Sequence, residues 1–349
     1  MKYIEAEEFL EKIKKLPVID VRSPSEFQQG HIPGAFNIAL FNDVERKRVG
    51  TLYKNSGKES SVLLGLDIVG PKMSGFVKAA IKIAPKREIL IHCWRGGMRS
   101  ASMAWLFETA GFKVSVLKGG YKAYRRFIRL KLEENMSLIV LGGKTGSGKS
   151  DILNHLALLG EQVLDLEGIA HHKGSAFGAF GQGKQPTSEQ FENNIYLELI
   201  KFDLSLPVWV EDESRAIGLV SIPEPLYKRI RESVVIFLDI NRTVRVKRLV
   251  KEYALFDKEL LNAAVSRIEK RLGGLNTKTA IEAININDFE TAASILLSYY
   301  DKAYLKGLSG REQKNVYRLE LLNDDPGTNA YKVMEYFKSL NLFCTKPIK

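Results

Sequence analysis

The chain has 349 residues, which is enough for two ordinary domains, because a single hydrophobic core stops growing well below this length. Hydrophobic residues make up 45% and charged residues 27%, and no apolar run approaches the ~20 residues of a membrane span. The N-terminus carries glutamates where a secretory signal has basic and apolar regions. We therefore expect a cytoplasmic protein with no membrane segment, and the formal charge of +11 favours a polyanionic partner such as nucleic acid.

Cysteine is rare in this chain, with Cys93 and Cys344 as its two examples. Two cysteines are too few for a disulfide framework or a cysteine-built metal site, so each must be judged by its local sequence. No distinctive loop surrounds Cys344, and we interpret it as incidental.

The first part of the chain, up to about residue 130, alternates short apolar runs with helical patterns. Residues 17–21 and 89–92 are typical of strands, and the charged stretch 122–134 is typical of a helix. Such alternation indicates a parallel sheet covered by helices. Because the pattern restarts at residue 138, we place a boundary near residue 135 and predict one domain at 1–135 and another at 136–349.

Cys93 lies in a loop that suits a reactive thiol. It directly follows the apolar strand at 88–92 and precedes a predicted helix at 101–110. Backbone N–H groups at a helix N-terminus, together with Arg95 and Arg99, are expected to favour the thiolate over a buried, inert thiol. The glycines that let the backbone close around a bound anion or a persulfide are Gly96 and Gly97.

Three motifs together resemble the rhodanese family, over about residues 1–130. Residues 20–27 read DVRSPSEF, residues 30–38 read GHIPGAFNI and residues 117–121 read LKGGY, in the family's order around the cysteine loop. The resemblance implies that Cys93 carries sulfur or selenium as a persulfide or perselenide. It also implies that four side chains chiefly support the fold around it, namely Asp20, Arg22, Glu26 and His31.

The second part of the chain repeats the α/β pattern. Its strand candidates lie at 138–141, 162–166, 208–210 and 234–238, each followed by loop residues and helical periodicity. From about residue 256 onward the chain is mainly helical in pattern, and basic. We therefore expect a second α/β domain with a helical C-terminal part.

A phosphate-binding loop is indicated at residues 143–150, which fit the pattern G-x-x-x-x-G-K-[ST] between a strand and the helical stretch 151–159. In such a loop the backbone N–H groups surround a diphosphate, Lys149 reaches the outer phosphate and Ser150 can hold Mg²⁺. These donors do not distinguish a nucleotide from another diphosphate. The residues assigned to this site are Gly143, Lys144, Thr145, Gly146, Ser147, Gly148, Lys149 and Ser150.

Three further side chains are candidates for the phosphate site. Asp212 follows the strand candidate at 208–210, as in a Walker B element, and would face a metal at Ser150; the alternative is a solvated acidic turn. Arg267 and Arg271 are four residues apart on a predicted helix. They would close on phosphate from a lid, unless they form a solvated basic face.

A rhodanese domain followed by a phosphate loop resembles the tRNA 2-selenouridine synthases, over nearly the whole chain. The resemblance rests on both loops and on residues 49–54 (VGTLYK), 165–178 (DLEGIAHHKGSAFG) and 211–215 (EDESR). The tail after about residue 300 has no comparable motif. The expected fold is α/β, with a rhodanese-like parallel-sheet domain followed by a P-loop NTPase-like α/β domain that has a helical C-terminal part.

The resemblance implies a two-step exchange at the wobble 2-thiouridine of tRNA. Geranyl diphosphate alkylates the sulfur, and selenium from selenophosphate then displaces the S-geranyl group, because an alkylated sulfur leaves as a thiol. We expect Cys93, Arg95 and Arg99 to receive or position selenium, and the phosphate loop to hold the prenyl diphosphate, with any Mg²⁺ at Ser150 and Asp212. Substrate contacts are assigned to Trp94, Gly96, Gly97, His171, His172 and Arg215.

The two histidines have alternative roles, as acid/base groups or RNA contacts on one side and as residues that order their glycine-rich loop on the other. Trp94 would stack on an extruded base. RNA binding also needs a positive surface, and we expect one of three basic patches to supply it. The patches are Arg46, Lys47, Arg48, Lys54 and Lys58; Arg125, Arg126, Arg129 and Lys131; and Arg242, Arg245, Lys247, Arg248 and Lys251.

Two other functions stay open from the sequence. One is a nucleotide-dependent RNA sulfurtransferase or a P-loop kinase or ATPase, which ATP turnover would reveal. The other is a regulatory module in which an idle rhodanese fold binds a partner and the phosphate loop acts as a switch. The cysteine argues against the second function, because an idle domain is expected to lack the nucleophile at Cys93.

Overall fold

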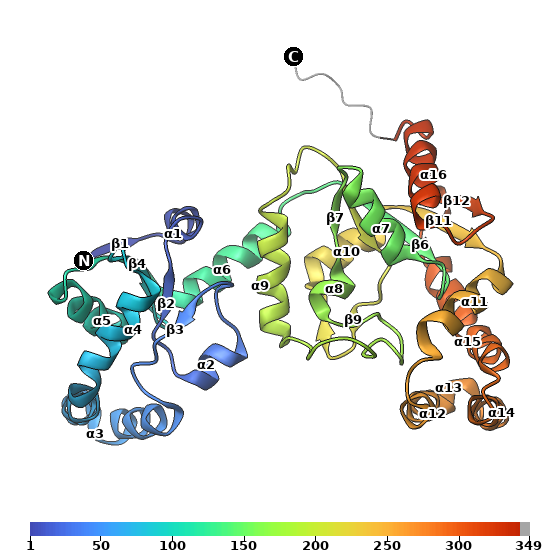
Figure 1. Ribbon diagram of the computed structural model, residues 1–349. Coiled ribbons are helices and arrows are strands. Elements are labelled where there is room, and N and C mark those ends of the chain that lie inside the picture. Colours follow the sequence, from blue (N-terminus) through green and yellow to red (C-terminus); the bar gives the residue numbers. More distant parts are fainter. Residues whose placement is uncertain (343–349) are drawn as a thin grey trace, which may run out of the picture. The chain divides into compact units, whose positions relative to one another are not determined.

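The computed structural model describes residues 1–342, and its chain divides into two compact units (Figure 1). The first unit comprises Met1–Glu134 with Glu192–Leu197, and the second comprises Asn135–Phe191 with the residues from Glu198 onward. The sequence did not foresee the part of helix α9 (Ser188–Leu199) that belongs with the first unit. Cys344 lies outside the described residues.

A five-stranded parallel sheet, in the order β1-β5-β4-β2-β3, forms the centre of the first unit. The middle strand β4 is almost entirely buried because helices cover both faces, which explains its continuous apolar run. The strands are β1 (Lys2–Ile4), β2 (Val18–Asp20), β3 (Phe36–Asn37), β4 (Glu88–His92) and β5 (Lys113–Leu117). The helices are α1 (Ala6–Ile13), α2 (Pro24–Gln29), α3 (Asp43–Val69), η1 (Gly70–Lys72), α4 (Met73–Ile83), α5 (Met98–Thr109) and α6 (Gly120–Glu133).

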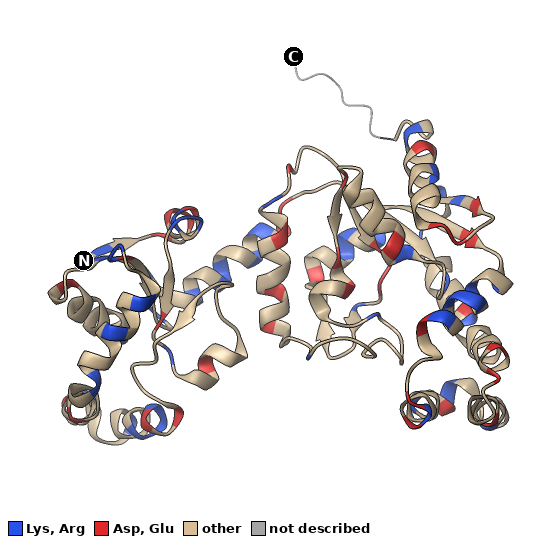
Figure 2. Ribbon diagram, viewed as in Figure 1, with Lys and Arg blue, Asp and Glu red and all other residues tan. Residues whose placement is uncertain are grey.

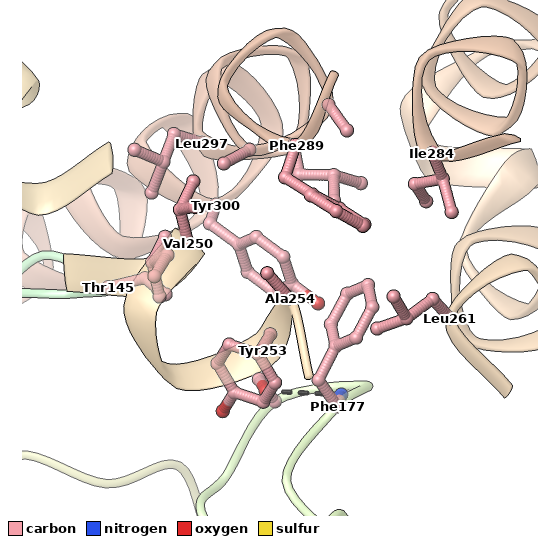
Figure 3. A pocket seen from close by; sticks show the side chains of 15 residues that line it. Thr145, Phe177, Val250, Tyr253, Ala254, Leu261, Ile284, Phe289, Leu297 and Tyr300 are labelled. Atoms are coloured by element: carbon pink, nitrogen blue, oxygen red, sulfur yellow. Dashed lines mark hydrogen bonds between the residues drawn. The ribbon is translucent and has the colours of Figure 1, made fainter. Parts of the chain in front are cut away.

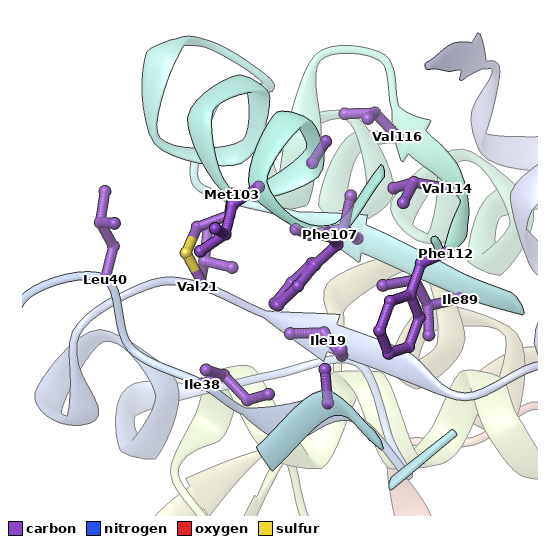
Figure 4. Packing of buried hydrophobic residues seen from close by; sticks show 14 of the residues in the cluster. Ile19, Val21, Ile38, Leu40, Ile89, Met103, Phe107, Phe112, Val114 and Val116 are labelled. Carbon is purple, nitrogen blue, oxygen red and sulfur yellow. The ribbon is translucent and has the colours of Figure 1, made fainter. Parts of the chain in front are cut away.

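Two apolar clusters pack against this sheet. In one, shown in Figure 4, Ile19 and Ile89 of the sheet meet Met103 and Phe107 of α5. In the other, side chains of α1 and α6 pack together with Tyr196 of α9. The two clusters fix the carboxyl end of β4, where Cys93 begins its loop.

A second five-stranded parallel sheet, in the order β12-β11-β6-β8-β7, forms the centre of the second unit. Helices α7 and α16 pack on it through an apolar cluster that includes Trp209 and Phe337. The C-terminal part is mainly helical, as expected, and it also contains strand β12, which the sequence did not predict and which pairs with β11 over six residues. The strands are β6 (Leu138–Gly143), β7 (Gln162–Leu164), β8 (Val208–Glu211), β11 (Val234–Ile240) and β12 (Val316–Leu321), with a small hairpin of β9 (Ala216–Ile217) and β10 (Val220–Ser221).

Helices make up most of the remaining second unit. Helices α12 to α15 surround an apolar cluster of their own, which also takes in Phe177 from the glycine-rich loop. Within residues 1–342, no helix is both long enough and apolar enough to cross a membrane. The helices are α7 (Lys149–Leu158), α8 (Leu166–Ala170), α10 (Glu224–Glu232), α11 (Arg242–Tyr253), α12 (Lys258–Arg267), α13 (Glu269–Leu272), α14 (Gly274–Asn285), α15 (Phe289–Ser309), η2 (Gln313–Asn315) and α16 (Pro326–Ser339).

Candidate active sites

The Cys93 loop lies between the end of β4 and the first turn of α5. Cys93 itself is 3% exposed, and its Sγ lies 3.2 Å from the hydroxyl of Ser100. That hydroxyl also lies 3.1 Å from the Gly97 carbonyl oxygen, so it can donate a hydrogen bond to either group. A thiol at a helix N-terminus with a hydroxyl donor beside it is suited to carry an anion.

A second loop, between β5 and α6, hydrogen-bonds to the backbone of the Cys93 loop. The backbone N–H of Tyr121 donates to the Cys93 carbonyl oxygen at 2.8 Å, and that of Lys122 donates to Trp94 at 3.0 Å. Gly120 has a φ of +60°, and a side chain there would overlap the Cys93 carbonyl oxygen. Glycine is therefore required at this position, which accounts for the double glycine of the LKGGY motif.

Arg99 is held by a carboxylate from the first part of the chain. Its guanidinium donates to Glu26 at 2.6 Å, and Arg46 lies 3.8 Å from the same carboxylate. Burial alone would raise the pKa of Glu26, but the hydrogen bond and charge of Arg99 outweigh it and lower that pKa. Glu26 thus fixes an arginine of the loop, whereas Arg95 is exposed.

Below the loop, a fully buried ion pair ties the motif strand to its neighbours. Arg22 donates to both carboxylate oxygens of Asp20 and to the Gly30 carbonyl, and its guanidinium lies 3.9 Å from the centre of the Tyr121 ring. Burial raises the pKa of Asp20, but His92 and Arg22 lower it by more, so the net shift is downward. These contacts match the fold-supporting role expected for Asp20 and Arg22.

Two other residues of this domain have clear places. His31 donates from Nδ1 to the Phe27 carbonyl at 3.0 Å and stacks on the Phe27 ring, a local structural role. Trp94 is half-buried, with its ring 5.8 Å from that of Tyr121. Its expected stacking on an RNA base stays a prediction.

The phosphate loop runs from the end of β6 into α7. The ammonium of Lys149 donates one hydrogen bond, of 2.9 Å, to the Gly143 carbonyl oxygen, which leaves donors for phosphate oxygens. Ser150 donates to a carboxylate oxygen of Glu167 at 2.9 Å. Glu167 lies in α8, just after β7, a strand of the same sheet as β6 from which β8 separates it.

Two more glutamates surround this part of the loop, and both favour the protonated form. Burial, followed by the charges of Asp165 and Glu167, raises the pKa of Glu211 well above its ordinary value. Burial and Glu167 likewise raise the pKa of Glu213, although Lys149 opposes them. Neutral carboxyl groups preserve the positive character that a diphosphate site needs.

Asp212 does not take the place expected for a Walker B aspartate. Its carboxylate is 5% exposed and binds the guanidinium of Arg311 and the hydroxyl of Tyr304, the latter at 2.7 Å. The Tyr304 hydroxyl in turn accepts from the backbone N–H of Gly143 at 2.8 Å. The carboxylate that contacts Ser150 is Glu167, because Asp212 is committed to side chains from the C-terminal tail.

Helix α11 brings arginines to the phosphate loop and appears as a blue segment in Figure 2. Arg245 is 2% exposed, donates to the Thr145 carbonyl at 3.1 Å and pairs with Asp301. Arg248 lies against Gly148, with its Cζ 3.0 Å from where a Cβ would stand. Of this basic patch, Arg245 and Arg248 therefore lie against the phosphate loop, whereas Arg242, Lys247 and Lys251 are exposed. Arg248 also pairs with Asp151 and Asp324.

A cavity of about 70 Å³ lies beside the phosphate loop (Figure 3). Thr145 of the phosphate loop forms one part of its wall, and α11, α12, α14, α15 and the glycine-rich loop form the rest. Its lining is almost entirely apolar: Leu249, Val250, Tyr253, Ala254, Leu261, Ile284, Phe289, Ala292, Ala293, Leu296, Leu297 and Tyr300, with Thr145, Ser175 and Phe177. No feature of the sequence pointed to this cavity, because its lining comes from helices far apart in the chain.

The remaining predicted residues lie around these features. His171 contacts the Lys184 carbonyl at 2.9 Å, and the His172 ring packs against Gly178, so both histidines contact their own loop. Their expected acid/base or RNA-binding role stays a prediction. Arg215 is exposed and pairs with Glu224. Within the described residues, two predicted arginines make no hydrogen bond or ion pair with the phosphate loop. Arg267 is exposed at the end of α12, and Arg271 donates to Tyr299 at 3.4 Å.

Metal binding can be judged from the donor groups. In the described part of the chain, no three His, Cys, Asp or Glu side chains gather as a metal-binding cluster. A Mg²⁺ ion on a diphosphate needs only one or two protein oxygens, with phosphate and water as its other ligands. Ser150 and Glu167 fit that requirement, whereas Asp212 is occupied by Arg311.

Taken together, a cysteine-bearing anion loop and a phosphate loop in one chain define an enzyme built from a rhodanese domain and a P-loop α/β domain. The sequence model described as tRNA 2-selenouridine synthase AAA domain matches residues 136–323, and the rhodanese-like domain model matches residues 5–127. The chain belongs to the tRNA 2-selenouridine synthase family.

Individual relatives agree over most of the chain. It is 37% identical to the tRNA 2-selenouridine synthase of Bdellovibrio bacteriovorus, over 85% of this chain and 90% of the relative. It is 32% identical to that of Bordetella petrii, over 90% and 94%, and 33% identical to that of Shewanella denitrificans, over 86% and 91%. The expected fold class and enzyme family are thereby confirmed.

Proposed function

We propose that this enzyme converts the wobble 2-thiouridine of tRNA to 2-selenouridine by way of S-geranyl-2-thiouridine, with geranyl diphosphate and selenophosphate as co-substrates. The similarity to tRNA 2-selenouridine synthases supports the tRNA substrate and the selenium product. The observation that favours a prenyl diphosphate over a nucleotide is the apolar cavity with Thr145 of the phosphate loop in its wall.

The cavity suits a hydrocarbon chain better than a nucleobase. A base has polar edges that lose hydrogen bonds to water on burial, and the lining offers few polar groups in return. Each methylene of a prenyl chain, by contrast, gains roughly 0.8 kcal/mol on leaving water. A ligand with its diphosphate in the loop and its chain beyond Thr145 uses both features.

The first step is alkylation of the RNA sulfur. The sulfur attacks C1 of geranyl diphosphate, the C1–O bond breaks, diphosphate leaves with the electron pair, and the base loses its N3 proton. Lys149 and the loop N–H groups stabilise the charge that develops on diphosphate, and Arg248 lies close enough to Gly148 to assist. Where Mg²⁺ is bound, Ser150 and Glu167 would hold it, and it would neutralise diphosphate charge.

The second step replaces sulfur with selenium. The selenium of selenophosphate attacks C2, the C2–S bond breaks, and geranylthiol leaves with a proton; water then cleaves the Se–P bond and releases phosphate, with no net oxidation. Cys93 with Arg95 and Arg99 receives or positions the selenium donor. The Ser100 hydroxyl, 3.2 Å from Cys93 Sγ, and the fixed guanidinium of Arg99 support an anion at this place.

The test is nucleoside mass spectrometry on an anticodon stem-loop that contains 2-thiouridine, without any nucleotide. We expect S-geranyl-2-thiouridine with geranyl diphosphate alone and 2-selenouridine when selenophosphate is added. If no modified uridine forms until ATP is present, the proposal is wrong, and a nucleotide-dependent sulfurtransferase explains the phosphate loop instead.

A further inference from the structure

The first unit carries an exposed basic segment on α3 that the reaction scheme does not use. Residues 46–58 read RKRVGTLYKNSGK, with five basic residues and no acidic one. Lys47, Arg48, Lys54 and Lys58 are all exposed. We propose that this segment is the surface that binds the anticodon arm of tRNA, an inference that rests on the proposed function.

The α3 segment differs from the other two basic patches in how its charges are compensated. Within residues 1–342, none of Lys47, Arg48, Lys54 and Lys58 makes an ion pair. In the α6 patch, Arg125 and Arg129 pair with Glu192, and Lys131 pairs with Glu134.

The α11 patch is partly compensated, since Arg245 pairs with Asp301 and Arg248 pairs with Asp151 and Asp324. Uncompensated exposed charge gains most from counterion release when phosphates bind. Of the three patches, the α3 segment has the most exposed charge without an ion pair in the described residues, four residues against three on α11 (Arg242, Lys247 and Lys251) and one on α6 (Arg126).

Helical spacing arranges the α3 segment for a nucleic-acid strand. Lys47 and Lys54 are seven residues apart, so they lie on one face, about 10 Å apart along the axis. Tyr53 is 54% exposed and shares a second face with Arg46 and Gly50. Basic groups along the backbone path and an exposed aromatic ring beside them are the combination that single-stranded RNA loops bind.

The same segment is connected to the Cys93 loop. Arg46 lies over Gly50, where a Cβ would stand 2.8 Å from its Nη1, and reaches the Glu26 carboxylate at 3.8 Å. Glu26 holds Arg99 of the Cys93 loop at 2.6 Å. RNA phosphates on Lys47 and Lys54 would therefore lie next to the loop that handles selenium, with Tyr53 available to stack on a base near the modified position.

The experiment measures binding of the 2-thiouridine stem-loop by fluorescence anisotropy over a range of salt concentrations. The variant K47A/K54A/K58A should bind about tenfold or more weakly, and the slope of log K against log salt should fall by about two. The control K78A/K82A/K86A removes the same charge from exposed lysines of the same unit and should behave as wild type.

Tyr53 gives an independent readout. Tyr53→Ala should weaken binding about tenfold without changing the salt slope. Tyr53→Phe should keep the wild-type affinity, because stacking needs the ring and not the hydroxyl. If the triple α3 variant keeps wild-type affinity and slope while wild type binds and modifies the stem-loop, the surface proposal is overturned. If wild type itself neither binds nor modifies the RNA, the proposed function has failed instead.

Discussion

The Cys93 loop and the phosphate loop share a backbone design but differ in the charge state of the carboxyl groups around them. Each follows a buried parallel strand and precedes a helix N-terminus. At the Cys93 loop, basic partners lower the pKa values of two carboxyl groups: His92 and Arg22 lower that of Asp20, and Arg99 lowers that of Glu26. At the phosphate loop, burial and neighbouring carboxylates raise the pKa values of Glu211 and Glu213.

This difference follows from what each loop must hold. A loop proposed to position a selenium donor needs fixed partners that orient its arginines, and an ionised carboxylate such as Glu26 does that for Arg99. A loop that takes a diphosphate would be weakened by ionised glutamates beside Lys149, and protonation of Glu213 avoids the repulsion. Local charge, as well as backbone shape, thus separates the two functions.

The largest expected effect comes from a change in the Cys93 loop, which should affect only the second reaction step. Cys93→Ala should lower selenium incorporation about a hundredfold or more and leave geranylation unchanged, because only the second step uses the loop that receives or positions the selenium donor. Mass spectrometry would then show S-geranyl-2-thiouridine accumulating. Wild-type yields of 2-selenouridine from this variant would remove Cys93 from the chemistry.

The converse change affects the first step. Lys149→Ala should slow geranyl transfer about a hundredfold, since it removes the charged donor for the leaving diphosphate. Initial rates with geranyl diphosphate measure this, and Lys184→Ala, at an exposed lysine of the same unit, is the matched control. Equal losses in both variants would indicate a general charge effect on RNA binding.

The cavity should determine which donors the phosphate loop accepts. Ala254→Phe fills space beside Thr145 and should lower kcat/KM for geranyl diphosphate about tenfold, with a smaller loss for the shorter dimethylallyl diphosphate. Leu255→Phe, at a neighbouring residue that is 93% exposed, should have no effect on either donor. Parallel losses for both donors in the Ala254 variant would show that the chain lies elsewhere.

The arginine clamp of the first loop has a smaller effect with a definite pH dependence. Glu26→Gln should cost about 1–2 kcal/mol of unfolding free energy at neutral pH, because Arg99 loses a charged acceptor. The pKa of folded Glu26 is lowered, so its contribution is present above the ordinary glutamate pKa and is lost as pH falls through the folded pKa. In denaturant titrations, the unfolding free energies of wild type and Glu26→Gln should therefore become equal in acid. A difference between them that does not depend on pH would contradict the ion pair.

Glu213 should show the opposite trend with the smallest amplitude. Its folded pKa is raised, so wild type loses stability as pH rises from the ordinary glutamate pKa toward the folded pKa. Glu213→Gln lacks this loss, and its melting temperature relative to wild type should increase by about 2–4 °C between pH 5 and pH 8. A constant difference would mean that Glu213 is ionised throughout.

The sequence predicted the two loops because their chemistry is local: Cys93, Lys149 and the glycines around them are contiguous with the strands that position them. It failed where partners come from distant segments. Asp212 satisfied the rule of an acid at a strand end, yet its environment is decided by Arg311 and Tyr304, about a hundred residues away.

Glu167 could have been found from its own position. It follows β7, whose carboxyl end lies at the same edge of the sheet as that of β6, and carboxyl ends of parallel strands form binding sites. Strand β12 was missed for a different reason. Its alternating burial is that of an edge strand, and the tail around it has a helical and basic composition.

The contact of Tyr304 and Arg311 with Asp212 bears on how the protein can be divided. A fragment that ends near residue 300 keeps every recognisable motif but leaves Asp212 as a buried carboxylate without its guanidinium, and removes the sheet edge formed by β12. We expect such a fragment to be poorly folded despite its intact phosphate loop. We therefore expect the second unit to need the chain through α16, which packs on the same sheet.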